Sequence, residues 1–218
     1  MSRKIRQPEK TLKVFCEGET EFNYFEYIRK NKKVSLTIRP VDMKGGGYGS
    51  FLQMLQEDAN SNCMAKIIVV DGDRALSVPG EEIKLKQLAE FCKVQNSSKR
   101  TPHILIVNYP DFEYVACLHR DTYKGQDALI YIKKVLGYQD VEDFKADADV
   151  FRVLTAKGGS IEKLRNSTNP NTKIVENRMK YNKTEYELNV KSKFLWERLG
   201  IRGTNFDDFY EVLDIIGA

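Results

Sequence analysis

Three short apolar runs in the first half of the sequence constrain the fold more than any other feature. They cover residues 12–16 (LKVFC), 66–70 (KIIVV) and 103–107 (HILIV), and acidic residues follow each run closely. Continuous apolar runs of this length are typical of strands buried on both faces, as in a parallel sheet. A fourth stretch, 34–41, alternates apolar and polar residues and predicts a half-buried strand.

Segments with apolar residues at helical spacing separate these strands. Helices are predicted to about residue 33, from residue 51, over 81–94 and over 112–119. Four alternations of strand and helix predict a parallel sheet with helices on both faces. We therefore expect an α/β core over 1–125, which begins with a basic arm over 1–10.

The pattern changes after residue 120. Helices are predicted over 128–135, 176–188 and 206–216, whereas 150–155 fits either a short strand or the end of a helix. We therefore expect a mainly helical C-terminal extension over 126–218, packed on the core.

Composition excludes several classes of protein. The 218 residues are 41% hydrophobic and 30% charged, which is typical of a globular chain with one sizeable core. No apolar run approaches the ~20 residues that a bilayer-spanning helix needs. The basic N-terminus lacks the apolar segment of a signal peptide, so a cytoplasmic location is expected. Residues 157–198 contain ten Lys and Arg but five Glu. This excess of positive charge favours either a surface that attracts nucleic-acid phosphates or a solvated helical surface.

Acidic residues follow the apolar runs. Glu17 and Glu21 come after the first run, Asp71 and Asp73 after the second, and Glu113 after the third. In an open α/β sheet, ligands bind outside the carboxyl ends of the strands. We therefore expect these carboxylates to lie in one crevice.

Such a crevice favours Mg²⁺, which prefers oxygen ligands and is often held by a few carboxylates and substrate phosphates. Phosphodiester hydrolysis is the chemistry that follows most directly. Each fragment also has a structural interpretation: Glu17 and Glu21 are favourable charges at a helix N-terminus, and Asp71-Gly72-Asp73 suits a turn. Arg74 could contact a phosphate, neutralise the acids or form a surface ion pair.

A glycine-rich segment precedes the second helix. Residues 44–50 read KGGGYGS, and backbone amides of such a loop before a helix can bind phosphate. The segment matches neither of the common phosphate-binding glycine motifs, so an ordinary loop is favoured.

His119 is more typical of a hydrogen-bonded, partly buried histidine than of a catalytic one.

Three segments resemble the RloB-like family of the Toprim superfamily. They are CEGETEFNYF, DGDR and NYPDFEYVACLH, in this order, and a weaker similarity extends to RMKYNKTE at 178–185. The resemblance covers roughly residues 12–120. It implies a Toprim-type, Rossmann-like α/β fold, as found in topoisomerases, primases and OLD-type nucleases.

The resemblance also implies site residues. By position, the Toprim glutamate corresponds to Glu17 and the Mg²⁺-binding DxD pair to Asp71 and Asp73. OLD-type nucleases have a second glutamate four residues after the first, which matches Glu21.

OLD-type nucleases further have a later acid, for which Glu113 is the candidate, and a lysine, for which Lys180 and Lys183 are the candidates. The third segment departs from the family pattern SNPxFE, because Asn108 and Tyr109 replace Ser and Asn.

The leading hypothesis is a nuclease that depends on Mg²⁺ or Mn²⁺ and hydrolyses DNA or RNA. Its metal ligands would be Glu17, which also counts as catalytic, and Glu21, Asp71, Asp73 and Glu113. A water molecule activated by the ion would be the nucleophile, and Lys180 or Lys183 would stabilise the developing phosphate charge. The resemblance implies a bacterial phage-defence or restriction-associated effector with an ABC-type ATPase partner. The alternative is a non-catalytic Toprim-fold module that binds nucleic acid or the ATPase.

Overall fold

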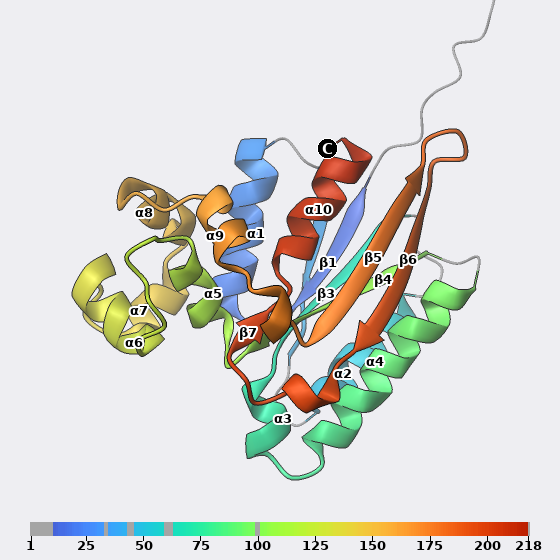
Figure 1. The fold of residues 1–218 in the computed structure, drawn as a ribbon, viewed down its shortest axis with the longest axis horizontal. Helices are drawn as coiled ribbons and strands as arrows, with labels where there is room; N and C mark the ends of the chain where they lie inside the picture. Colours follow the sequence, from blue (N-terminus) through green and yellow to red (C-terminus); the bar gives the residue numbers. More distant parts are fainter. Residues whose placement is uncertain (1–10, 33–34, 43–45, 59–62, 99–100, 218) are drawn as a thin grey trace, which may run out of the picture.

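The main sheet of the computed structural model contains the predicted strands. The structure describes residues 11–32, 35–42, 46–58, 63–98 and 101–217, so the expected basic arm and the start of the glycine-rich loop lie outside the described residues. Within these ranges, five strands follow the order β2 (Leu36–Pro40), β1 (Leu12–Cys16), β3 (Ala65–Asp71), β4 (His103–Tyr109) and β7 (Gly203–Thr204) (Figure 1). The first four are parallel, and β7 is antiparallel to β4.

Helices cover both faces of this sheet because its strands alternate apolar side chains between two cores. Val14, Ile67 and Ile104 face one core, together with residues of α1 (Glu19–Lys32), α5 (Phe112–Leu118) and α10 (Asp207–Ile216). Their neighbours Phe15, Ile68 and Leu105 face the other core, with α2 (Tyr48–Glu57) and α4 (Glu81–Ser97). The prediction of an α/β fold with a largely parallel sheet between helices is confirmed.

The strand order creates a switch point. The chain leaves β1 toward β2 on one side and later places β3 on the other side of β1. Helices that follow β1 and β3 therefore diverge at the carboxyl ends of these two strands, where open α/β sheets bind their ligands.

The second half begins with short helices that pack beside α1 and α5 (Figure 1). The segment 150–155 is helical, which settles the alternative left open by its sequence. None of the helices in the described ranges is long and apolar enough to cross a membrane. The short elements are α3 (Asp73–Ser77), α6 (Ala128–Tyr131), the π-helical η1 (Ile132–Leu136), α7 (Val141–Ala146), α8 (Val150–Ala156), α9 (Ile161–Ser167), η2 (Pro170–Thr172) and η3 (Trp196–Arg198).

The prediction of a helix over 176–188 is wrong. The chain forms an antiparallel hairpin of β5 (Val175–Asn182) and β6 (Glu187–Phe194), which lies beside β4 and α4 (Figure 1). The amide of the buried Asn177 donates a hydrogen bond to the Leu105 carbonyl oxygen at 3.1 Å. The hairpin therefore satisfies part of the backbone hydrogen bonding at the outer edge of β4. Such a tertiary contact overrides helix propensity.

The C-terminal half is less helical than expected and is joined to the first half. β7 extends the main sheet, and residues of α10 belong to the same core as β1 and α1. Asn205 supports this junction, because its side chain accepts from the Val107 amide at 2.9 Å and donates to the Leu105 carbonyl at 3.0 Å.

Candidate functional site

The acids gather at the carboxyl ends of three neighbouring parallel strands. Glu17 directly follows β1, Asp71 is the last residue of β3, and Asp73 begins α3. Glu113 lies in the first turn of α5, four residues beyond β4. The Asp71 backbone amide lies 3.4 Å from Glu17 Oε2, so the ends of β1 and β3 are in direct contact at the switch point.

Glu21 joins the group from α1. The helix begins at Glu19, and the hydroxyl of the buried Thr20 donates a hydrogen bond to the Glu113 carboxylate. A Cβ atom at Gly18 would lie 2.6 Å from Glu21 Oε2. Glycine at this position therefore gives the Glu21 carboxylate room against the turn after β1.

Burial and mutual repulsion raise the pKa values of these carboxyls. Burial is the main cause for Glu17, whose pKa rises to about 7, and for Glu21, whose pKa rises to about 8. Glu113 and Glu17 add repulsion at Glu21. The pKa of Asp71 rises well above its ordinary value, first through burial and then through Glu21, Glu17, Glu113 and Asp111. These groups therefore share one electrostatic environment.

The site contains two further residues, Asp111 and Lys145, which are not among the candidates from the sequence. Asp111 is the N-cap of α5 and accepts from the Tyr114 amide at 2.9 Å, and its pKa is raised by burial. Lys145 of α7 lies with its Nζ 3.8 Å from Glu113 Oε1, and its side chain is 49% exposed. Asp111 was detectable as an acid before a predicted helix start, whereas no local pattern indicates that Lys145 reaches the strand ends.

We call Glu17, Glu21, Asp71, Asp73, Asp111 and Glu113 the carboxylate site. Lys145 lowers the pKa values of Glu17, Glu21 and Glu113, although less than their burial raises them. Attraction to the acids raises the pKa of Lys145 itself, against the effect of burial. Lys145 is therefore a cation at the solvent-facing rim of the site.

The structure brings neither Lys180 nor Lys183 to the carboxylate site. Asn177 contacts the middle of β4, and the hairpin then runs toward the amino end of that strand, where residues 185–188 share a recess with Pro102. Lys183 lines another recess, with Gly217 after α10. No contact between these lysines and the acids therefore supports the catalytic role that was predicted for them.

Arg74 lies at the edge of the carboxylate site. Its Nε donates to Glu81 Oε2 at 3.1 Å, and its charge lowers the pKa of Glu17. Glu81 Oε2 also accepts from the Tyr48 amide at 2.9 Å, at the N-terminus of α2. In its described part, the glycine-rich segment is therefore held by a carboxylate of the protein itself.

The donors suit a hard divalent cation, although no group of three or more His, Cys, Asp or Glu side chains in the described ranges is arranged to hold a metal ion. Glu21 Oε1 and Asp71 Oδ1 are buried with no hydrogen-bond partner among the described residues. Leaving a buried carboxylate oxygen unpaired is costly, and a cation would relieve this cost. Mg²⁺ commonly takes only one or two protein carboxylates and completes its shell with water and phosphate. Glu17 and Asp71, which meet at the switch point, fit this requirement.

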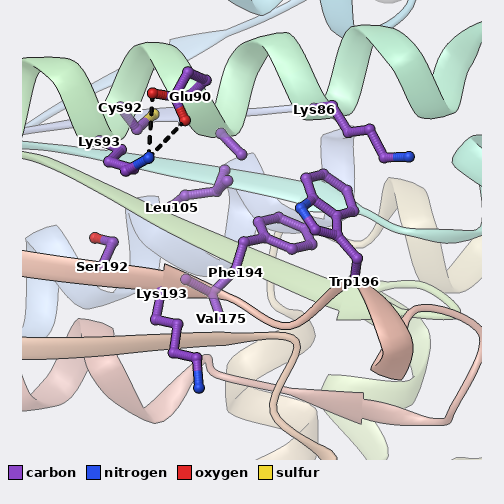
Figure 2. A pocket seen from close by; sticks show the side chains of 11 residues that line it. Lys86, Glu90, Cys92, Lys93, Leu105, Val175, Ser192, Lys193, Phe194 and Trp196 are labelled. Atoms are coloured by element: carbon purple, nitrogen blue, oxygen red, sulfur yellow. Dashed lines mark hydrogen bonds and ion pairs between the residues drawn. The ribbon is translucent and has the colours of Figure 1, made fainter.

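A cavity of about 460 Å³ lies between α4 and the end of β6 (Figure 2). The rings of Phe194 and Trp196 stack there with their centroids 3.7 Å apart. The Lys86 ammonium lies 5.3 Å from the centroid of the Trp196 ring (Figure 2). Burial raises the pKa of the lining Cys92 to about 12, so that this thiol stays protonated and unreactive. None of the carboxylate-site residues lines this cavity.

The carboxylate site therefore combines three features: carboxyl groups with raised pKa values, buried oxygens with no partner in the described ranges, and two cations at its rim. Comparison with protein-family models, curated proteins and solved structures found no match.

Proposed function

We propose that the protein is a nuclease that depends on Mg²⁺ or Mn²⁺, with the carboxylate site as its active centre. One observation carries the proposal: six carboxylates converge on the carboxyl ends of three parallel strands, and two of their buried oxygens have no hydrogen-bond partner among the described residues. Repulsion among these groups disfavours the empty, fully ionised site. A divalent cation and a phosphate group would complement this arrangement.

The residues of the chain divide into three roles. Glu17 and Asp71 would hold the cation, which supplies Lewis-acid stabilisation of phosphate charge and an activated water. Glu21, which is buried next to these ligands, would exchange a proton with the activated water. Lys145 and Arg74 place positive charge at the rim, where a substrate phosphate would lie.

The resemblance to RloB-like proteins supports the same proposal and extends it. It adds a Toprim identity for the α/β core and a role as a phage-defence or restriction-associated effector. An ABC-type ATPase would then be the partner that regulates cleavage. The resemblance assigns Asp73 to the metal, and Asp73 begins the helix that follows Asp71.

Cleavage by purified protein tests the proposal. Plasmid DNA, single-stranded DNA and tRNA are incubated with Mg²⁺, Mn²⁺ or EDTA. The protein is the wild type, Asp71→Asn, Glu17→Gln, or the control Glu142→Gln, which changes an exposed acid of α7 outside the carboxylate site. We expect metal-dependent cleavage by the wild type and the control, and at least a hundredfold loss in the two site variants.

A parallel measurement does not depend on activity. Mg²⁺ is expected to raise the melting temperature of the wild type and of Glu142→Gln, but not that of Asp71→Asn. Nucleic-acid binding that needs no metal and persists in Asp71→Asn, without cleavage even when the ATPase partner is added, would replace the nuclease by the non-catalytic binding module.

A further inference from the structure

A buried carboxylate outside the carboxylate site joins three segments of the fold. Glu81 begins α4 and is only 2% exposed. Its Oε2 accepts from the Tyr48 amide at 2.9 Å and from Arg74 Nε at 3.1 Å, and its Oε1 accepts from Lys84 Nζ at 2.8 Å. Burial would raise the pKa of Glu81, but these hydrogen bonds outweigh it and the pKa is lowered. Glu81 is therefore a stable internal anion.

The glycine-rich segment is shaped around this anion. Gly47 has a φ of +57°, which L-residues other than glycine rarely adopt. A Cβ atom at Gly47 would also overlap the Glu81 carboxylate, whose Oε2 would lie 1.8 Å away. Lys84 completes the enclosure by donating to the Gly46 carbonyl at 3.1 Å. Glu81 thus occupies the anion position at the N-terminus of α2.

Two contacts connect Glu81 to the carboxylate site. The Tyr48 side chain is fully buried, and its hydroxyl donates to the Asp71 carbonyl oxygen at 2.5 Å. Arg74 lies one residue after Asp73 in α3, and its charge lowers the pKa of Glu17. The Glu81 carboxylate therefore holds both Tyr48, which hydrogen-bonds the backbone of Asp71, and Arg74, whose positive charge acts on Glu17.

We infer that Glu81 is a positioning residue that orients Arg74 toward a phosphate of a nucleic-acid substrate. Engaging Nε fixes the plane of the guanidinium and leaves its two Nη groups for the phosphate, which they can contact as a pair. The inference rests on the proposed function, since it assigns the substrate contact of the same site. It predicts that removing the Glu81 charge weakens substrate binding more than the chemical step.

The variants Glu81→Gln, Arg74→Gln and their combination test the inference. Glutamine keeps the shape of Glu81 and avoids the cavity that alanine would leave. Glu82→Gln is the matched control, because Glu82 is the next residue of α4 and is half-exposed in an ion pair with Lys86. We expect Glu81→Gln and Arg74→Gln each to raise KM about tenfold with kcat changed less than about twofold, as for one lost charge-assisted contact. The double variant should be no worse than either single variant.

Binding supplies the second readout. Fluorescence anisotropy of labelled single-stranded DNA and RNA is measured over a salt series. One phosphate contact fewer is expected to reduce the slope of log K against log salt by about 0.7 in Glu81→Gln and Arg74→Gln. A purely structural role for Glu81 would not reproduce the slope change of Arg74→Gln.

The outcomes are distinguishable. Effects of Glu81 and Arg74 that add, or an unchanged KM and salt slope in Glu81→Gln, would overturn the inference while leaving the nuclease in place. Absence of any nucleic-acid binding by the wild type would overturn both. Binding that Asp71→Asn retains and Glu81→Gln loses, without cleavage by the wild type, would support the role of Glu81 and reject the nuclease.

Discussion

Replacing Glu21 by glutamine is expected to stabilise the protein in the absence of divalent metal. The Glu21 side chain is 3% exposed, and its Oε1 has no hydrogen-bond partner among the described residues. Burial and the neighbouring Glu113 and Glu17 raise its pKa from 4.5 to about 8. Glutamine has nearly the same shape and cannot ionise, so it escapes this penalty.

The magnitude follows from the pKa difference. The folded protein keeps Glu21 protonated at pH 7, whereas the unfolded chain ionises it, and this difference lowers the free energy of unfolding by at most about 3 kcal/mol. Because the folded pKa is the higher one, stability is fully present below pH 4.5 and is lost as the pH rises through about 8. The gain from Glu21→Gln should therefore grow with pH.

Urea unfolding in EDTA at pH 5, 7 and 8.5 measures this gain. We expect Glu21→Gln to exceed the wild type by less than about 1 kcal/mol at pH 5 and by up to about 3 kcal/mol at pH 7. Glu19→Gln is the control, because Glu19 is an exposed acid of the same helical turn. Mg²⁺ should stabilise the wild type more than Glu21→Gln.

A gain that is the same at all three pH values would show that the charge of Glu21 is not its cause. A variant less stable than the wild type at pH 7 would refute the unpaired, high-pKa state of Glu21 altogether.

Three further predictions concern other parts of the molecule. Lys145→Met is expected to lower cleavage at least tenfold, while Lys183→Met changes it less than twofold in the same assay. Burial lowers the pKa of His119 to about 4 from 6.5, so the fold loses about 3 kcal/mol from this group as the pH falls through that interval. The stability advantage of the wild type over His119→Gln in urea unfolding should shrink by that amount, and a constant difference would contradict it. Asn177→Ala removes three hydrogen bonds of a buried amide and should cost about 2 kcal/mol in the same experiment; an unchanged stability would show that the hairpin does not depend on these contacts.

The main sheet could be predicted from the sequence because its central strands are buried on both faces. The apolar runs at 12–16, 66–70 and 103–107 are β1, β3 and β4, and each lies between two cores. Parallel strands carry their carboxyl ends to one side, so the meeting of acids that follow separate strands could also be expected.

Other features depend on contacts between distant segments, which local patterns do not encode. The hairpin at 175–194 is rich in residues that suit helices, and its place is decided by Asn177 against β4. Lys145 reaches Glu113 because the short helix α7 packs beside α1, and Glu81 resembles an ordinary acid at a helix start. Each has its role only in the assembled fold.

The contact between the first and last helices has a consequence for folding. Tyr24 of α1 hydrogen-bonds Tyr210 of α10 across 186 residues, and Phe25 and Phe209 pack with ring centroids 5.0 Å apart. Contacts of such sequence separation slow folding, because a long chain segment must be ordered before they form. During synthesis Phe112 and Phe151 can cover part of the aromatic face of α1, but the part that packs against α10 stays uncovered until α10 leaves the ribosome. The growing chain exposes this part of α1 to aggregation until α10 has formed, and a chaperone that covers it would raise the yield of folded protein.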